Sequence, residues 1–381
     1  MDLSWSKEQL ALKTEVIEFA RAELNKNVVE NDENSQFPVE NWLKCARFGI
    51  QGLCIPQKYG GQGKDVLTTI LVMEGLGYGC EDNGLTVALN GQMWSIQEPL
   101  LFFGSETQKE KYLPGLCNGR LLGAHGMTEH ASGSDAFSLQ TRAERYDGGY
   151  ILNGAKTMIS LGPVCDLAVV FATTDSKLGQ WGISAFLVDK GMAGFRVSRS
   201  WDKMGQRTVP NGELILQDCF VPEKNRLGPV GAGVSVFNSS MEWERSFIFA
   251  SHIGAMERQL EKAISFAKER RRFGQPIGKF QSVSNRIAAM KLRLETARLH
   301  LYKAAWLKEH DKPAAMQAAI TKLYISEAYL RSSLDAIRVH GGSGYLTETE
   351  IERDLRDATG GVLYTGTSDI QRLVIAWLLG L

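Results

Sequence analysis

Two charged groups in the sequence have residue types and spacing that could do chemistry. The run Arg270–Arg272 stands directly before Phe273-Gly274. Because a guanidinium donates hydrogen bonds in pairs, this run suits two adjacent phosphates, although it also suits a solvated helix end. The second group is Glu244, which directly precedes Arg245. These two residues can form an ordinary surface ion pair, or the carboxylate can act as a general base.

The composition excludes several classes of partner. Lysine plus arginine and aspartate plus glutamate both number 43, so the formal net charge is zero. No global field would draw the chain to nucleic acid or to an anionic membrane. The six cysteines are scattered, without a CxxC pair or a Cys/His spacing that suits zinc. We therefore predict reduced, mostly structural thiols, no metal site, and a small or medium-sized ligand.

No targeting or membrane-spanning segment is expected. The residues after Met1 show no basic region followed by an apolar one, and no later run of about 18 uncharged apolar residues exists. The sequence therefore predicts a cytoplasmic protein, or one in another reducing compartment, with no membrane partner.

Three zones of the chain must position the charged groups. Apolar residues recur at helical spacing over residues 1–120, short β-branched and aromatic runs fill residues 121–228, and long helical patterns return over residues 229–381. We predict an α+β fold with an N-terminal α-helical domain, a middle antiparallel β domain that is barrel-like, and a C-terminal four-helix bundle. The three zones are expected to pack as one unit.

Local signals place individual elements within these zones. Ser105 with Gln108 predicts a helix N-cap box, and the segment Tyr146–Tyr150 predicts a tight hairpin turn. Strands and long helices are predicted, in order, over Asp166–Thr173, Gly182–Asp189, Phe195–Arg199, Gly212–Val221, Glu257–Arg271 and Phe280–Glu309.

Six segments together resemble the acyl-CoA dehydrogenase family. Each alone could be an ordinary turn or helix end, but they follow the family's order and cover nearly the whole chain. They are Met127–Asp135, Asn153–Ser160, Arg270–Ile277, Phe280-Gln281, His340–Tyr345, and Leu355–Ala358 leading to Tyr364–Arg372. The resemblance implies the family's three-domain fold and an FAD-dependent oxidation of an acyl thioester.

The resemblance also implies where FAD lies, between the middle domain and the C-terminal bundle. Thr128 and Ser160 are the candidates to hydrogen-bond the isoalloxazine ring. Met158 stands where most relatives have a tryptophan over the flavin; it and Ile159 could pack the ring or be only core residues of a strand. The full set of cofactor-binding candidates is Met127, Thr128, Ser134, Met158, Ile159, Ser160, Arg270, Phe273, Gln281, Arg338, Gly341, Gly342, Thr365, Thr367 and Asp369.

Part of this set is expected to serve the FAD of a neighbouring subunit. In the family, the arm that corresponds to Arg270 and Phe273 reaches across a dimer interface to the pyrophosphate and adenine. Gly341 and Gly342 permit close backbone approach to that cofactor. Arg338 replaces a glutamine of many relatives, which changes the type of contact but not its location. The resemblance therefore implies a homotetramer, a dimer of dimers, in which a single chain would lose FAD.

The resemblance assigns the catalytic base to Glu244. Many relatives carry a glutamate at the position of Thr365, and a threonine hydroxyl stays protonated at neutral pH. A minority of the family instead has its glutamate just before an arginine, in register with Glu244 and Arg245. Burial beside Trp243 and Phe247 would raise the pKa of Glu244 toward neutrality. The substrate-binding candidates are Ser134, Glu242 and Arg245.

Over its whole length the chain looks most like the prolyl-carrier-protein dehydrogenases and oxidases of secondary metabolism. We therefore expect oxidation of an L-prolyl thioester on an acyl carrier protein to a dehydroprolyl thioester. A short or branched-chain acyl-CoA dehydrogenase is the alternative substrate class. An oxidase of another substrate on the same fold, or a base-less scaffold protein, is the alternative from outside thioester dehydrogenation. Either O2 or an electron-transferring flavoprotein could reoxidise the flavin.

Overall fold

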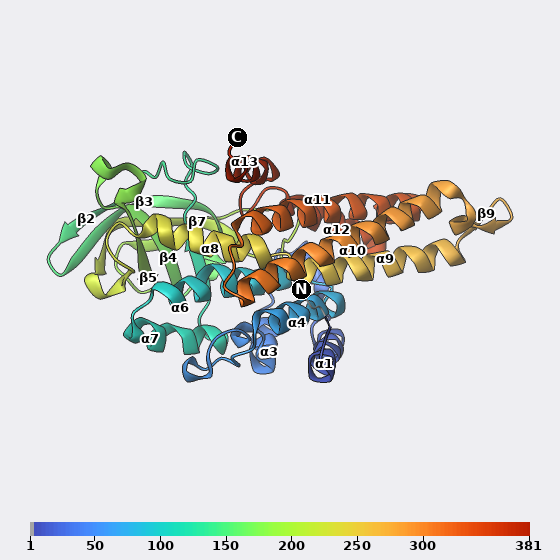
Figure 1. The fold of residues 1–381 in the computed structure, drawn as a ribbon, viewed down its shortest axis with the longest axis horizontal. Coiled ribbons are helices and arrows are strands. Elements are labelled where there is room, and N and C mark those ends of the chain that lie inside the picture. The colour runs from blue at the N-terminus through green and yellow to red at the C-terminus, as the bar shows by residue number, and fades with distance from the viewer. Residues whose placement is uncertain (1–3) are drawn as a thin grey trace.

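The structure is a computed structural model that describes residues 4–381. Met1–Leu3, where the predicted N-terminal domain begins, lie outside the described residues. Figure 1 shows an elongated molecule, with the strands gathered at one end and long helices running from them toward a small hairpin, β9, at the other end. The order of helical, β and helical parts agrees with the predicted fold class.

The N-terminal part is helical. Ser6 and Ser105 each begin a helix with a complete capping box, so the N-cap box predicted at Ser105 and Gln108 is confirmed. A π-helical turn, η3 (Met93–Gln97), joins two of the helices. The helices are α1 (Lys7–Glu23), α2 (Val28–Glu33), α3 (Val39–Phe48), α4 (Val66–Gly79), α5 (Asn83–Gln92), α6 (Glu98–Phe103) and α7 (Glu106–Cys117).

The middle part is one sheet in the order β6-β7-β3-β2-β4-β5-β8, with β1 paired to β4. Most neighbours are antiparallel as predicted, and the turn at Tyr146–Tyr150 forms the predicted β2–β3 hairpin. The structure adds parallel pairing between β1 and β4. The strands are β1 (Gly123–Gly126), β2 (Arg142–Tyr146), β3 (Gly149–Ser160), β4 (Leu167–Thr173), β5 (Ile183–Asp189), β6 (Phe195–Ser200), β7 (Asn211–Pro222) and β8 (Arg226–Leu227).

The C-terminal part is a bundle of long helices that carries a short arm. The predicted helix over Glu257–Arg271 is wrong at its end, because the helix stops at Glu269 and the chain turns into a hairpin. Phe273 and Gly274 both have positive φ, of 50° and 80°, as a two-residue hairpin loop requires. The elements are α8 (Gly233–Phe247), α9 (Ala250–Glu269), β9 (Arg271–Arg272), β10 (Gln275–Pro276), α10 (Gln281–Glu309), α11 (Ala315–His340), α12 (Ile351–Gly361) and α13 (Ser368–Leu378).

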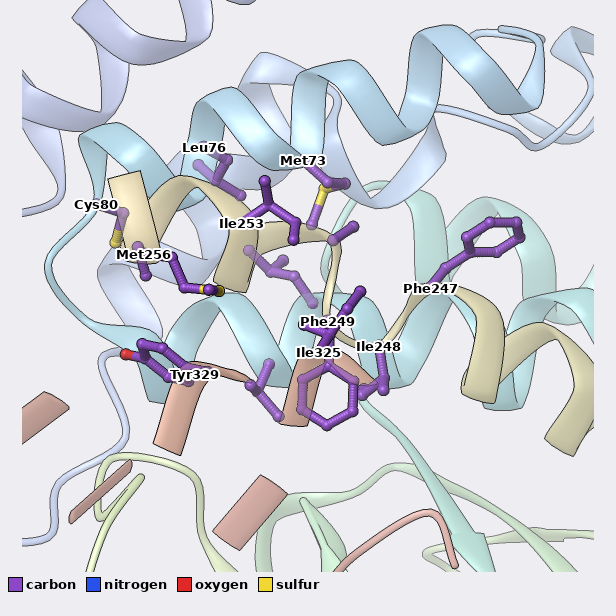
Figure 2. Close-up of a cluster of buried hydrophobic side chains, with 14 of the residues drawn as sticks. Met73, Leu76, Cys80, Phe247, Ile248, Phe249, Ile253, Met256, Ile325 and Tyr329 are labelled. Atoms are coloured by element: carbon purple, nitrogen blue, oxygen red, sulfur yellow. The ribbon is translucent and has the colours of Figure 1, made fainter. Parts of the chain in front are cut away.

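A shared apolar core joins the two helical parts. Helix α4 is mostly apolar and almost wholly buried, as expected for a central helix, and its one carboxylate, Glu74, pairs with Lys13 and Arg298. It packs closely on α9 at Gly77, where a Cβ atom would lie 1.8 Å from the Ser251 carbonyl oxygen. Figure 2 shows the side chains that meet here from α4, α8, α9 and α11, among them Met73, Leu76, Phe247, Ile253, Met256, Ile325 and Tyr329. This core fixes the position of α8, which carries Glu244.

No helix among residues 4–381 is long and apolar enough to cross a membrane. The domain boundaries predicted after residues 120 and 228 stay predictions.

Candidate active site

Two hydroxyl groups from distant parts of the chain hold the carboxylate of Glu244. Ser95 Oγ donates a hydrogen bond to Glu244 Oε2 over 2.6 Å, and Thr365 Oγ1 donates one to Glu244 Oε1 over 2.7 Å. Ser95 lies in the π-helical turn η3, and Thr365 lies between α12 and α13. The three elements α8, η3 and the α12–α13 loop therefore meet at one carboxylate.

The surroundings of Glu244 tune its acidity in two directions. Burial raises the pKa of Glu244, which confirms the expected direction. The hydrogen bonds from Ser95 and Thr365 and the nearby positive charge of Arg245 oppose that rise, because each stabilises the ionised form. The result is a half-buried carboxylate that is more basic than a free one and is still held as an acceptor.

A buried lysine lies near Glu244 and Arg245. Lys322, on α11, is fully buried, and its Nζ atom has no hydrogen-bond partner among residues 4–381. Burial, followed by the positive charge of Arg245, lowers the pKa of Lys322 to about 7. Burial also lowers the pKa of Arg245, and the charge of Glu244 opposes that shift. Tyr364 is neutral here, because burial raises the pKa of its phenol.

An aromatic cluster borders the same stretch of α8. The rings of Trp94 and Trp243 stack with 5.8 Å between their centroids and 5° between their planes. Phe247 lies tilted against both rings. Trp94 and Phe247 are fully buried and Trp243 nearly so. These rings form a buried apolar face beside residues 243–247 of α8.

The middle domain brings two of the motif segments together. The amide of Thr157 donates to the Thr128 carbonyl over 2.9 Å, so Met127-Thr128 lies beside Met158–Ser160. Met158 has a positive φ of 57° and a side chain that is 59% exposed, where the register of β3 shifts. The side chain of Ile159 is buried in the sheet core. The core interpretation is therefore correct for Ile159 and wrong for Met158.

A buried ion pair holds these segments in place. Lys156 Nζ donates to Glu129 Oε1 over 2.6 Å and also to the Met127 carbonyl. Glu129 accepts further hydrogen bonds from the amides of Gln140 and Thr141. Burial alone would raise the pKa of Glu129, but the charge of Lys156 and these hydrogen bonds lower it. The pair thus closes the loop from Glu129 to Thr141 onto the sheet.

The remaining cofactor-binding candidates lie in two other places. Thr367 caps α13 by accepting a hydrogen bond from the Ile370 amide, and Asp369 pairs with Arg372 beside it, so both follow Thr365 closely. A second set lies at the far end of the bundle, on the arm and at the neighbouring ends of α10 and α11 (Figure 1). That set consists of Arg270, Phe273, Gln281, Arg338, Gly341 and Gly342, all of them exposed.

The far end of the bundle and the middle domain lie at opposite ends of the molecule (Figure 1), so one chain does not bring all the candidates together. The ring of Phe273 is 94% exposed. Cβ atoms placed on Gly341 and Gly342 would meet nothing within 4 Å in the described part of the chain. The residues present fit a flavin dinucleotide: hydroxyls and an open Met158 side chain at one end, and exposed guanidinium and aromatic groups at the other.

The substrate-binding candidates differ in their surroundings. Ser134 lies exposed in the loop between β1 and β2. Glu242 forms an ion pair with Lys308, whose Nζ also lies 4.6 Å from the centroid of the Trp243 ring. Arg245 is half-buried, and its Nε atom has no partner among residues 4–381.

Sequence reasoning did not identify Ser95, Lys322 or Gln371. Ser95 gives no local signal, because it is 149 positions from Glu244. Lys322 has a weak one, since its neighbours at i−4 and i+3, Ala318 and Ile325, are buried apolar residues of one helix face. Gln371 lies inside the resembling segment, but only the structure shows its carboxamide donating to the carbonyls of Thr365 and Gly366.

Neither a metal centre nor a reactive thiol stands out. Across residues 4–381 no group of three or more His, Cys, Asp or Glu side chains is placed to hold a metal ion. All six cysteines are free, and five of them are buried. Burial raises the pKa of the Cys80, Cys117 and Cys165 thiols to about 12, so these stay protonated at neutral pH.

Comparison with known proteins covers the whole chain. The families described as acyl-CoA dehydrogenase N-terminal, middle and C-terminal domain match residues 6–120, 124–219 and 231–379. An L-prolyl-[peptidyl-carrier protein] dehydrogenase of Pseudomonas fluorescens is 44% identical over 347 residues, which are 91% of each chain.

Two solved structures are similar over almost their full length. The prolyl acyl carrier protein oxidase AnaB has a TM-score of 0.98 and 48% identity, over 99% of this chain and 100% of its own. A structure described as PigA with FAD and proline has a TM-score of 0.97 and 37% identity, over 100% of this chain and 99% of its own.

Proposed function

Because this chain belongs to the acyl-CoA dehydrogenase family, we propose that it is an FAD-dependent enzyme that oxidises an L-prolyl thioester carried by an acyl carrier protein to a dehydroprolyl thioester. The observation that carries the proposal is Glu244, a carboxylate made more basic by burial and held between two hydroxyl donors. The full-length similarity to prolyl-carrier-protein enzymes supports the substrate class.

Glu244 removes the α proton of the thioester. Abstraction needs a carboxylate that is ionised at neutral pH and yet basic enough to take a weakly acidic proton. Burial supplies the basicity, and Ser95, Thr365 and the charge of Arg245 favour the ionised form. When bound, FAD would supply the acceptor for the hydride that leaves the neighbouring position.

FAD binding divides between two chains. Thr128, Met158 and Ser160 of one chain would hold the isoalloxazine ring, with Met127, Ile159 and Ser134 beside them. Arg270, Phe273, Gln281, Arg338, Gly341 and Gly342 of a second chain hold the pyrophosphate and adenosine. Thr367 and Asp369 would approach the adenosine side, and Thr365 lies at the Glu244 carboxylate. The separation of these sets within one chain supports a shared site, and hence the homotetramer.

The carrier protein presents its acyl group on a phosphopantetheine arm, so the enzyme needs a narrow passage to Glu244 and no pocket for a nucleotide. Ser134, Glu242 and Arg245 line the approach to that carboxylate. An electron-transferring flavoprotein or O2 takes the electrons from the reduced enzyme. The protein works in the cytoplasm, where carrier proteins are loaded.

Flavin bleaching tests this function. Purified protein should be yellow, and prolyl-carrier protein should bleach it rapidly under anaerobic conditions. Free proline should be inert, because without the thioester its α proton is far less acidic and the binding energy of the arm is absent. Equal or faster bleaching by isovaleryl-CoA would move the assignment to a short or branched-chain acyl-CoA dehydrogenase. Colourless protein that cannot be reconstituted with FAD would indicate a scaffold.

A further inference from the structure

We infer that Ser95 and Thr365 are positioning residues that together hold the Glu244 carboxylate ionised and aimed for proton abstraction. This inference rests on the proposed function, since it assigns their task from that of Glu244. The two hydroxyls approach different oxygens of the same carboxylate, from Ser95 to Oε2 and from Thr365 to Oε1. Two donors on two oxygens fix both the rotation and the tilt of the group.

The hydrogen-bond directions are set by chemistry. An ionised carboxylate is only an acceptor, so each hydroxyl donates its single hydrogen bond to Glu244. Each carboxylate oxygen keeps a second lone pair. One of these lone pairs accepts the α proton of the substrate. Hydrogen bonds to the charged form favour that form, so both hydroxyls act against the burial that raises the pKa of Glu244.

Thr365 is held in an unusual backbone conformation to make its contact. Its φ is 58°, which is rare and unfavourable for a β-branched residue. The loop is secured by Gln371, whose side-chain nitrogen donates to the carbonyls of Thr365 and Gly366 over 3.2 and 3.1 Å. A strained residue with a fixed hydrogen bond suits a group whose orientation matters.

Ser95 is also held in an irregular part of the backbone. It is 4% exposed and lies in the π-helical turn η3, a local irregularity that interrupts the helix between α5 and α6. Such single π-helical turns redirect a side chain that a regular helix would point elsewhere. Here the Ser95 hydroxyl reaches Glu244 of α8, the same carboxylate that Thr365 binds.

The other charged groups around Glu244 cannot replace these two. Arg245, on α8, and Lys322, on α11, both lower the pKa of Glu244 through their charge, but neither donates a hydrogen bond to it in the described structure. Tyr364 also faces Glu244, and its phenol is neutral because burial raises its pKa. Removing one hydroxyl should therefore shift the titration of Glu244 without abolishing the field of its neighbours.

The test is the pH dependence of flavin reduction by prolyl-carrier protein in the FAD-loaded enzyme. The rate rises with pH as Glu244 ionises, so losing a donor that stabilises the ionised form must move this acid limb to higher pH. Ser95→Ala and Thr365→Val should each move it up by about one pH unit, which is tenfold in rate below the limb. The double variant should move it further than either single variant, but not by their exact sum, because both donors share one carboxylate.

Several controls separate this role from a merely structural one. Thr365→Ser keeps the hydroxyl and should restore the wild-type limb. Thr359→Val is the matched control, because Thr359 makes its hydrogen bond to the Leu355 carbonyl in α12, away from Glu244. Flavin content and the thermal midpoint are measured for every variant, so a folding defect is seen directly.

The outcomes are distinguishable. If Glu244→Gln is inactive while Ser95→Ala and Thr365→Val leave the acid limb in place, the positioning role is wrong and the proposed function stands. If Glu244→Gln still reduces flavin within tenfold of wild type, the base assignment itself fails. If Thr365→Ser shifts the limb as far as Thr365→Val does, the methyl group, and not the hydroxyl, is what matters, and the inference is overturned.

Discussion

The interior of the chain and its far end are built on opposite principles. In the interior, charged groups are enclosed and held by the same chain: Glu244 by two hydroxyls, and Glu129 by Lys156 and two amides. At the far end, Phe273 is 94% exposed and Arg270 lies in solvent on a two-stranded arm. The base is thus held within one chain, whereas the proposed function assigns the far half of the cofactor to a second chain.

The difference follows from what each region must do. A base needs a tuned pKa, and tuning requires enclosure by neighbours that do not move. In the proposed shared site, the far half of the dinucleotide is held by exposed groups such as Arg270 and Phe273, which one chain leaves open. Substitutions should therefore separate cleanly: those in the interior change rate or stability, and those at the far end change occupancy.

The largest effect is expected from Glu244→Gln. Loss of the base should slow flavin reduction by about 10³-fold or more, while FAD content and the thermal midpoint stay unchanged. Stopped-flow absorbance with prolyl-carrier protein measures the rate. Glu261→Gln is the matched control, because Glu261 is an exposed carboxylate of α9 that pairs with the Tyr78 hydroxyl. A comparable loss of flavin-reduction rate in both variants would show that Glu244 is not the catalytic base.

The next largest effect is on stability, from Glu129→Gln. This change leaves the ammonium of Lys156 buried without its counter-charge, a defect worth about 3–5 kcal/mol. Thermal unfolding should show a clearly lower midpoint. Glu144→Gln, at an exposed position of β2, should leave the midpoint where it is. An unchanged midpoint for Glu129→Gln would mean that the loop from Glu129 to Thr141 is held by other contacts.

At the far end, Arg270→Ala should weaken FAD binding by roughly 10- to 100-fold, since one guanidinium on phosphate is lost. Flavin content after dialysis and the oligomeric state by light scattering measure the effect. The rate per bound flavin should stay normal, which is the point of contrast with Glu244→Gln. Arg120→Ala, at an exposed arginine that contacts Asn118, serves as control. Full occupancy and an unchanged oligomer would argue against a shared site.

The smallest effect sharpens the picture of the interior. The folded-state pKa of Lys322, about 7, lies below the unfolded value of about 10.4. The unfolded chain therefore binds more protons between these values, and stability falls as pH is lowered from about 10 to 7. Lys322→Met should remove this dependence and raise the midpoint at pH 7 by a few degrees. Lys303→Met, at an exposed position, should change neither the pH dependence nor the midpoint. A lower midpoint for Lys322→Met would show that the buried ammonium is stabilised by its neighbours.

Several features could be predicted from sequence because they are local. The capping box at Ser105, the hairpin at Tyr146–Tyr150 and the strands of the middle domain each depend on a few neighbouring residues. The error at Arg270 and Arg271 has the same origin. Their charges suit a helix end, but the positive φ of Phe273 and Gly274 is a turn requirement that overrides the helical pattern.

By itself the sequence determined the three-part order of the chain, the family and the candidate base, because these depend on motif order and on the replacement of a glutamate by Thr365. Only the tertiary structure decided what surrounds that base. Ser95, Thr365 and Lys322 come from three elements that share no sequence pattern with α8, and they meet it through the packing of buried helices. A pKa depends on distances and on enclosure, and both arise only when distant segments pack together.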